Sequence, residues 1–283
     1  MESTEDIGGF DSPLLERVRK FWDDRPCNIR HSPKEMGTLE YFEQVRERRY
    51  FVEQHIAGFA QFERWEGKSV LEVGCGIGTD TVEFAKAGAR VTAVDLSPKS
   101  LEIARKRFEV YGLDATLVEA NAEALSKTIP PQPYDLVYSW GVIHHTPNPG
   151  NALEEFRKYC RRETEVRVMV YAKWSWKVLW IIVKFGKGMF WKWRKLVGEY
   201  SEAQESSPVT YVYSARAARA LFEAHGFEVL NIGKDFIFPF SVPYYRKYQY
   251  RKVWYFRWIP WFLFRALERF LGWNLLVVAR VKA

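Results

Sequence analysis

Cysteine is scarce in this sequence, and the few cysteines lie far apart. Among 283 residues there are three, Cys27, Cys75 and Cys160, and no two of them form a C-x-x-C pair. This spacing suggests neither a disulfide framework nor a zinc site. We therefore expect a protein of the reducing cytoplasm that holds no metal.

Long apolar runs are also missing. The longest, 178–183 and 258–264, fall well short of the roughly 20 residues that cross a bilayer. The first dozen residues carry four acidic side chains, whereas a secretory signal begins with a basic segment. The net charge of +7 must therefore arise later in the chain. These features predict a cytoplasmic protein, with peripheral contact at the inner membrane face left open.

The most informative segment present is Val70-Leu-Glu-Val-Gly-Cys-Gly-Ile-Gly-Thr-Asp80. A buried strand runs into a turn whose glycines let the backbone bend sharply and let a ligand approach closely. The spacing is Gly-x-Gly-x-Gly, not the Gly-x-Gly-x-x-Gly of dinucleotide sites, and a pyrophosphate would be repelled by Glu72. S-adenosylmethionine (SAM) carries an ammonium and a sulfonium and no phosphate, so a carboxylate suits it.

A second apolar strand ends in Asp95, 21 residues after Gly74. A carboxylate at that place can accept hydrogen bonds from both hydroxyls of a ribose. Together the two strands outline a pocket for a nucleoside.

With these pieces in place the sequence resembles the class I SAM-dependent methyltransferases, in the broad group of quinone-biosynthesis and small-molecule enzymes. The resemblance is close over 66–172 and looser over 214–233 and 274–282. The glycine loop, Asp95-Leu-Ser-Pro, Asn121-Ala-Glu and the segment Tyr134-Asp-Leu-Val-Tyr-Ser-Trp-Gly-Val-Ile-His-His-Thr-Pro-Asn-Pro149 carry it. The family often has Asp where this chain has Asn121, but an amide can still bond the adenine amino group.

The resemblance implies SAM as cofactor and S-adenosylhomocysteine (SAH) as product. Gly74 and Gly76 would line the methionine moiety, Asp95 would hold the ribose, and Asn121 with Ala122 would border the adenine. The residues expected at the cofactor are Glu72, Gly74, Cys75, Gly76, Asp95, Leu96, Asn121, Ala122 and Trp140. Burial of Trp140 as ordinary core is the alternative for that residue.

Strand-like and helical segments alternate along the core, which predicts an α/β fold with a Rossmann-like sheet and helices on both faces. Seven strands are expected, at 68–73, 90–94, 115–119, 134–139, 164–171, 227–232 and 274–282, and four helices, at 79–87, 98–111, 150–160 and 214–225. The family places the last strand antiparallel between the fifth and sixth.

The division into parts follows from these segments. A helical cap over 1–66 would cover the cofactor, and the core would span 67–172, 214–233 and 274–283. Two insertions, 173–213 and 234–273, leave the sheet at its ligand-binding edge and should converge beside the site.

Nine of the twelve tryptophans lie in 174–193 and 254–273, interleaved with lysine and arginine. In the first insertion, helical spacing puts Lys173, Lys177 and Lys184 on one face and Trp174, Val178, Ile181 and Phe185 on another. These segments suit a membrane interface through 174–193 and 244–273. A lid with buried aromatic residues is an alternative, and nucleic-acid binding is the less favoured one.

Methyl transfer from a sulfonium needs alignment of the acceptor, exclusion of water and, for some acceptors, removal of a proton. His144 or His145, just after the fourth strand, could be that base, or their turn could be a structural connector. Tyr50 could face the methyl group and a neighbouring arginine could bind the methionine carboxylate, although a solvated helix face is the simpler interpretation of Arg48-Arg-Tyr-Phe.

The sequence thus predicts a SAM-dependent methyltransferase for a small or lipid-like acceptor, with O-methylation of an apolar molecule near a membrane surface as the leading hypothesis. An RNA methyltransferase is one alternative, but the Asn/Asp-Pro-Pro-aromatic motif of the amino-methylating nucleic-acid enzymes is absent at 139–142. A SAM-binding scaffold protein without catalysis is the other.

Overall fold

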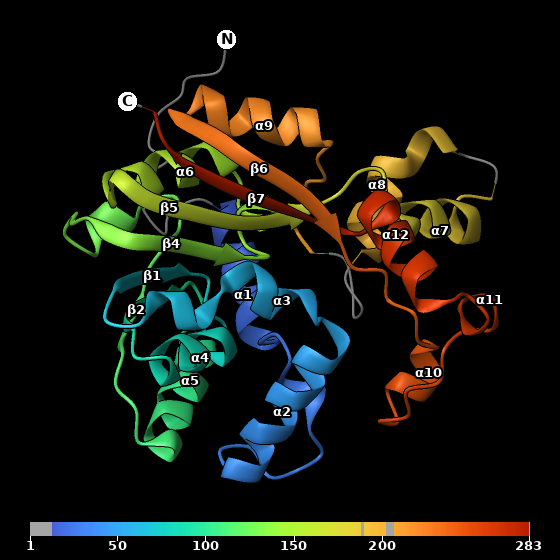
Figure 1. Ribbon diagram of the computed structural model, residues 1–283, viewed down its shortest axis with the longest axis horizontal. Coiled ribbons are helices and arrows are strands. Elements are labelled where there is room, and N and C mark those ends of the chain that lie inside the picture. The colour runs from blue at the N-terminus through green and yellow to red at the C-terminus, as the bar shows by residue number, and fades with distance from the viewer. Residues whose placement is uncertain (1–12, 188–189, 202–206, 283) are drawn as a thin grey trace.

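The computed structural model describes residues 13–187, 190–201 and 207–282. Its centre is a seven-stranded sheet of order β3-β2-β1-β4-β5-β7-β6 (Figure 1). The strands are β1 (Ser69–Val73), β2 (Arg90–Asp95), β3 (Thr116–Glu119), β4 (Tyr134–Trp140), β5 (Cys160–Tyr171), β6 (Phe227–Asp235) and β7 (Asn274–Val281). β7 runs antiparallel to β5 and β6, while the pairs of β1 to β5 are parallel. The predicted Rossmann-like sheet and the place of its last strand are confirmed.

Local signals set the helix ends in the core. α5 (Pro98–Tyr111) begins after Ser97, whose Oγ accepts a hydrogen bond from the Ser100 amide, and it ends at Gly112 in a left-handed conformation. β5 begins four residues before the predicted 164. It extends because Cys160 pairs with Tyr134 across an irregularity in the register.

Apolar residues pack on both faces of the sheet. On one face, the sheet packs against Leu153 and Phe156 of α6 (Pro149–Lys158) and Phe222 of α9 (Ala215–Ala224). On the other, it packs against Phe84 of α4 (Thr79–Lys86) and Leu101 of α5. The helices lie above and below the sheet in Figure 1. This two-sided burial keeps the core strands rigid and so fixes the loops at their carboxyl ends.

The leader is helical as predicted and consists of α1 (Pro13–Asp24), η1 (Ile29–His31), α2 (Leu39–Val52), α3 (His55–Ala60) and η2 (Phe62–Trp65). Leu15 and Val18 of α1 are buried, as are Tyr41 and Phe42 of α2. Residues 1–12 of the predicted cap lie outside the described residues. Short 3₁₀ turns η3 (Leu125–Lys127) and η4 (Ile143–His145) follow β3 and β4.

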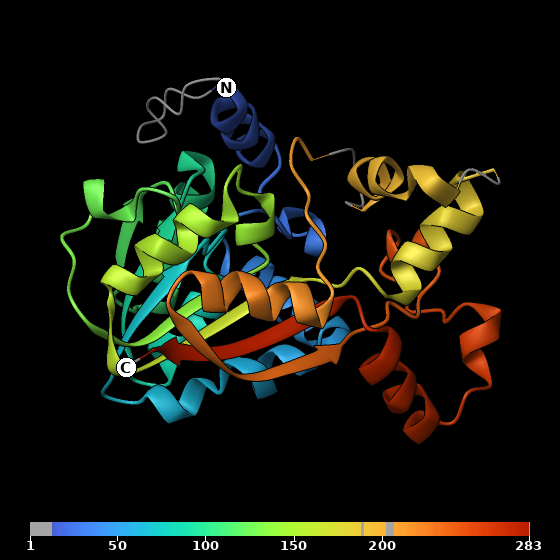
Figure 2. The same cartoon turned by 90° about the horizontal axis from the view of Figure 1, so that it is seen from above.

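The two insertions form a separate helical lobe beyond the strand ends (Figures 1 and 2). The first holds α7 (Trp176–Phe185), η5 (Phe190–Lys192) and α8 (Trp193–Tyr200); the second holds α10 (Val242–Tyr245), α11 (Trp254–Arg257) and α12 (Trp261–Leu271). They meet where the Trp176 ring lies 5.5 Å from that of Phe256. The expected convergence is therefore present.

One detail of the first insertion differs from prediction. α7 begins only at Trp176, because the Ser175 hydroxyl caps it by accepting from the Val178 amide. Lys173 and Trp174 precede the helix, so they do not share its faces, and Trp174 is 66% exposed. Val178 and Ile181 are buried, as the periodicity predicts.

Candidate active site

A cavity of about 390 Å³ lies at the carboxyl ends of the core strands. The leader, the glycine loop and both insertions contribute to its walls. This is the edge at which open α/β sheets bind their ligands.

The glycine loop forms one wall, and two of its glycines cannot be replaced without consequence. Gly74 has φ +82°, and a Cβ there would lie 2.0 Å from a methyl carbon of Val142. Gly76 has φ +53°, and a Cβ there would meet nothing within 4 Å. The first glycine thus permits close packing of β1 against the turn after β4, and the second leaves space beside the cavity.

Asp95 ends β2 at the same wall. Its Oδ2 accepts from the Gly76 amide at 2.7 Å, and its Oδ1 accepts from the Ser97 amide at 2.9 Å. Each carboxylate oxygen has a second lone pair, so both can accept another hydrogen bond from a ligand. Burial raises the pKa of Asp95, and the bonds from these two amides oppose that rise.

Glu72, on β1, is 3% exposed and lines the cavity. Its Oε2 accepts from the Thr81 hydroxyl at 2.6 Å. Burial raises its pKa to about 8, and the neighbouring charge of Asp80 adds to that rise. A carboxylate so poorly solvated is favoured in its charged form by a cation at the site.

The other residues predicted at the cofactor also reach this cavity. The Oδ1 of Asn121 accepts from the Glu123 amide at 3.0 Å, which leaves its amide nitrogen as a donor. Trp140 lines the cavity at the end of β4. All nine predicted residues are among those that line it: Glu72, Gly74, Cys75, Gly76, Asp95, Leu96, Asn121, Ala122 and Trp140.

Known proteins share both this segment and this fold. Residues 70–163 match the family model described as a methyltransferase domain. The ubiquinone biosynthesis O-methyltransferase of Azoarcus sp. is 41% identical over 83 residues, which cover 29% of this chain and 35% of that protein. The protein of the same name from Vibrio cholerae is 34% identical over 92 residues, or 32% and 37% of the two chains. The matched region thus spans about a third of these relatives.

Residues 70–163 thus match a methyltransferase domain, and the seven-stranded sheet around them has the Rossmann-like methyltransferase fold. Among solved structures, magnesium protoporphyrin IX methyltransferase from Synechocystis with bound SAH shares the fold at a TM-score of 0.54 and 17% identity, covering 97% of this chain and 96% of that one. A SAM-dependent methyltransferase from Clostridium acetobutylicum also gives 0.54, at 10% identity, covering 86% and 99%.

A buried ion-pair cluster beside the glycine loop corrects one interpretation of the sequence. Arg49 Nε and Nη2 donate to the two carboxylate oxygens of Asp80 at 3.0 and 2.8 Å. The hydroxyls of Tyr50 and Tyr138 donate to the same carboxylate at 2.8 and 3.1 Å. The segment around Arg48 is therefore not a solvated helix face, since Arg48 is 5% exposed and Arg49 is held against the glycine loop.

Two consequences follow from the cluster. The Tyr50 side chain is engaged by Asp80, and Tyr50 is not among the residues that line the cavity. Arg49 does line it. Sequence reasoning missed Asp80 although it belongs to the glycine-loop motif; an acidic residue in the first turn of the following helix was the available signal.

The structure separates the two histidines of η4. His144 is fully buried, does not line the cavity, and its ring nitrogens have no hydrogen-bond partner among the described residues. Burial, with the neighbouring His145, lowers its pKa well below the usual value. His145 does line the cavity, and its Nδ1 lies 2.8 Å from the Val209 carbonyl oxygen.

The far half of the cavity is built mostly by segments that the resemblance does not cover. Polar groups there come from the leader, the first insertion and the start of β7, namely Glu53, Lys177 and Asn274. Lys177 Nζ lies 4.5 Å from the centroid of the Trp273 ring. The aromatic residues that share this half are Tyr171, Phe236, Phe238, Tyr245 and Trp273. Among the described residues, no group of three metal-ligating side chains comes together.

Proposed function

We propose that this chain is an enzyme that uses SAM to methylate a hydroxyl group of a small, apolar, quinone-like acceptor. One observation carries the proposal: two carboxylates suited to a cationic nucleoside, Glu72 and Asp95, line the same cavity as a group of aromatic side chains. The relatives named ubiquinone biosynthesis O-methyltransferases support a hydroxyl of a quinone-like molecule.

The residues present fit SAM. Asp95 offers two oxygens to a ribose, Asn121 offers an amide to an adenine edge, and Glu72 offers its carboxylate to an ammonium group. The open space beside Gly76 admits the ligand where any side chain would intrude. When bound, SAM would supply an electrophilic methyl group, so the protein's task is to place the acceptor, exclude water and remove its proton.

Asp95→Ala is expected to weaken SAM binding by about 1–3 kcal/mol, because charge-assisted hydrogen bonds to the ribose are lost. Titration calorimetry measures the affinity for SAM. The affinity of Asp95→Asn, which keeps one acceptor oxygen, should lie between those of the wild type and Asp95→Ala. Asp114→Ala, at an exposed site after α5, is the control and should bind normally. Wild-type affinity in Asp95→Ala would remove the ribose assignment.

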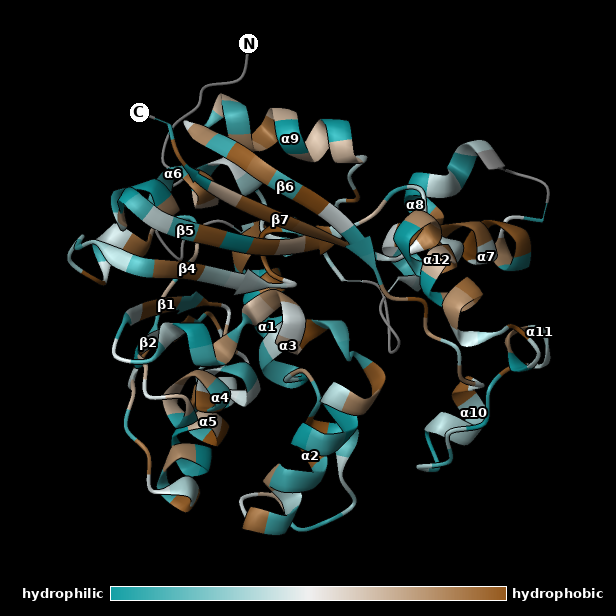
Figure 3. Cartoon of the chain, in the orientation of Figure 1, coloured by the Kyte–Doolittle hydropathy of each residue, from teal (hydrophilic) through white to brown (hydrophobic). Residues whose placement is uncertain are grey.

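The helical lobe supports the membrane part of the proposal. We define the aromatic platform as Trp254, Trp258, Trp261, Phe262 and Phe270, which are 65–81% exposed. Apolar stretches colour α7 and α12 in Figure 3. The alternative in which the insertion aromatics form a buried lid is wrong for these side chains, although Phe256 and Trp273 are buried.

The charge around the platform favours an anionic lipid surface as its partner. Residues 234–273 contain eight Lys and Arg against two acidic residues. Both acids, Asp235 and Glu268, are paired with Arg265 at 2.8 and 2.5 Å. Exposed rings among cations suit lipid headgroups, and Phe236 and Trp273, at the two ends of the same insertion, line the cavity. A lipid-soluble acceptor would then reach the site from the membrane side.

Within 13–187, 190–201 and 207–282, none of the helices has the length and apolar character needed to traverse a bilayer. Contact would therefore be peripheral wherever these residues provide it. On this proposal the protein works at the cytoplasmic face of a membrane.

The triple change of Trp254, Trp258 and Trp261 to serine should lower partitioning onto vesicles of anionic phospholipid by about tenfold or more, because three rings no longer enter the interface. Co-sedimentation with the vesicles measures this partitioning. A triple serine variant at exposed apolar sites outside the lobe, Met36, Leu39 and Leu230, is the control. Added salt should weaken wild-type binding, since the cations are exposed. Equal sedimentation of both variants would end the membrane proposal.

A further inference from the structure

Among the described residues, four carboxylates line the cavity: Glu53, Glu72, Asp80 and Asp95. Glu53 is the one for which neither cofactor binding nor the ion pair with Arg49 accounts. Glu72 accepts from Thr81, Asp80 is held by Arg49, and Asp95 caps the glycine loop. Glu53 follows directly on α2, and its backbone amide closes that helix by donating to the Arg49 carbonyl. Glu53 lines the cavity, and its carboxylate is close to Lys177 and Asn274.

Neighbouring groups hold Glu53 where β5, β6 and β7 come together. Its carboxylate is hydrogen-bonded by Asn274, the first residue of β7, which pairs in register with Tyr171 and Asp235. Asn274 Nδ2 in turn lies 2.9 Å from His55 Nε2. Through its hydrogen bond with Asn274, Glu53 of the leader is fixed to the sheet.

The same contacts bring Glu53 close to the cofactor half. The His55 ring lies 5.3 Å from that of Trp140, which ends β4 beside the glycine loop. Glu53 therefore stands at the boundary between the two compartments, where an acceptor atom must meet the methyl group. No other carboxylate from the leader lines the cavity within the described residues.

The charges that face Glu53 come from several elements. Burial raises its pKa, Arg49 on α2 and Lys177 on α7 oppose that rise, and Asp80 on α4 adds to it. Tyr245 on α10 is close enough to be affected by its charge. A carboxyl raised in this way is better matched to a phenol than an ordinary surface carboxylate, since proton transfer is most effective when donor and acceptor pKa values approach each other.

The histidines are less suited to this task. His144 does not reach the cavity. Burial, with Arg48 and Arg49, lowers the pKa of His31 to about 3, which makes it a very weak base. His145 approaches the Val209 carbonyl through Nδ1, and its ring packs between those of Trp22, at 5.1 Å, and Tyr171, at 5.4 Å.

We propose that Glu53 is the general base of the acceptor site and that its substrate class is a phenol or catechol carried by an apolar ring. The hydroxyl proton passes to a carboxylate oxygen of Glu53 as the hydroxyl oxygen forms its bond to the methyl carbon. The carbon–sulfur bond breaks, its electron pair stays on sulfur as SAH forms, and the proton on Glu53 is then released to water. Asn274 is a positioning residue, because it orients Glu53. This inference rests on the proposed function.

The first test uses two acceptors of different acidity, 4-hexylcatechol and 4-nitrocatechol, in an alkaline buffer where only the second is ionised. Glu53→Gln should lower kcat for 4-hexylcatechol by about 100-fold or more, because the base is gone. It should retain kcat for 4-nitrocatechol to within about threefold, because an ionised acceptor needs no base. The acidic limb of the kcat profile for 4-hexylcatechol should also disappear.

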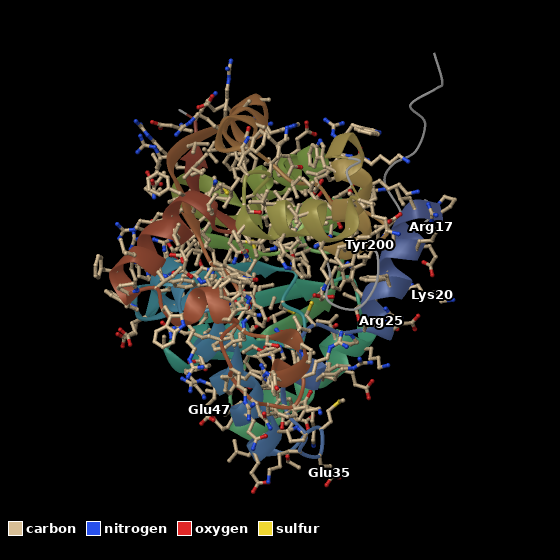
Figure 4. All side chains as sticks on the ribbon, turned by 90° about the vertical axis from the view of Figure 1, so that its right-hand side faces the viewer. Arg17, Lys20, Arg25, Glu35, Glu47 and Tyr200 are labelled. Carbon is tan, nitrogen blue, oxygen red and sulfur yellow. The ribbon has the colours of Figure 1, made fainter. Side chains whose placement is uncertain are left out.

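The second test does not depend on turnover. Binding of ionised 4-nitrocatechol to the SAH-loaded protein should take up close to one proton when Glu53 is present and almost none in Glu53→Gln. Calorimetry in two buffers of different ionisation enthalpy measures the uptake. Glu47→Gln is the matched control, since Glu47 lies on α2, the helix that Glu53 follows, and points outward (Figure 4). SAM affinity should be unchanged in both variants.

The outcomes separate this inference from the proposed function. Equal losses on both catechols, or proton uptake that persists in Glu53→Gln and vanishes in His145→Gln, would overturn the role of Glu53 and leave the proposed function standing. A wild-type protein that binds SAM but methylates neither catechol would overturn the acceptor class, and the role of Glu53 with it.

Discussion

Replacing Asp80 by alanine is expected to lower the free energy of unfolding by about 3–5 kcal/mol, the range for removing one partner of a buried ion pair. Asp80 is 2% exposed and accepts hydrogen bonds from Arg49, Tyr50 and Tyr138. Without it the guanidinium is left in a buried position with its main counter-charge gone. Chemical denaturation followed by circular dichroism measures the change.

Two further variants identify the cause of that loss. Glu83→Ala, on the same helix, removes the partner of Arg46, whose side chain is 37% exposed, so it should cost no more than about 1 kcal/mol. The double change of Arg49 and Asp80 to leucine should recover much of the loss, because no uncompensated charge remains. A double variant as unstable as Asp80→Ala would show that packing, and not charge, is responsible.

The second large effect is a dependence of SAM binding on pH. The pKa of Glu72 is raised from 4.5 to about 8 in the ligand-free fold, and SAM offers an ammonium that favours the ionised carboxylate. Affinity should therefore rise with pH, by up to about tenfold per unit, as pH approaches 8 from below. In Glu72→Gln the slope should be absent. Calorimetry across this range measures both proteins.

The same shift predicts the opposite trend for the stability of the ligand-free protein. Because the folded-state pKa of Glu72 lies above its unfolded value, its contribution is fully present below about pH 4.5 and is lost as pH rises through about 8. The melting temperature should fall less steeply over this range in Glu72→Gln than in the wild type. A wild-type affinity that does not vary with pH would show that Glu72 is already ionised, or that it does not contact the cofactor.

The meeting of the predicted cofactor residues at one cavity could be predicted from the sequence because they lie on neighbouring segments of the chain. Glu72, Gly74 and Gly76 lie within one strand and turn, and Asp95 ends the next strand of the same unit. In a parallel sheet the carboxyl ends of neighbouring strands lie at one edge, so the spacing of these residues already places them together. The ends of α5 were equally predictable, because Ser97-Pro98 and Gly112 act on the backbone within a few residues.

The contacts between the leader and the core were not predictable in this way. Asp80 and Arg49 are 31 positions apart, and Asn274 is 219 positions from His55. Whether Arg49 faces solvent or a carboxylate depends on how the leader packs on the core, and helical periodicity in α2 does not specify that packing. The prediction of a solvated face failed for this reason.

The sequence by itself determined the sheet, its strand order once the resemblance was recognised, and the glycine turn with its two carboxylates. Backbone conformation and strand alternation are set by residues near one another in the chain, so a linear pattern suffices for them. Only the tertiary structure decided that His144 does not reach the cavity, that Glu53 lines it, and that Trp254, Trp258 and Trp261 are exposed. Burial and charge pairing depend on contacts between segments that are distant in the chain, and the packing of the whole chain determines those contacts.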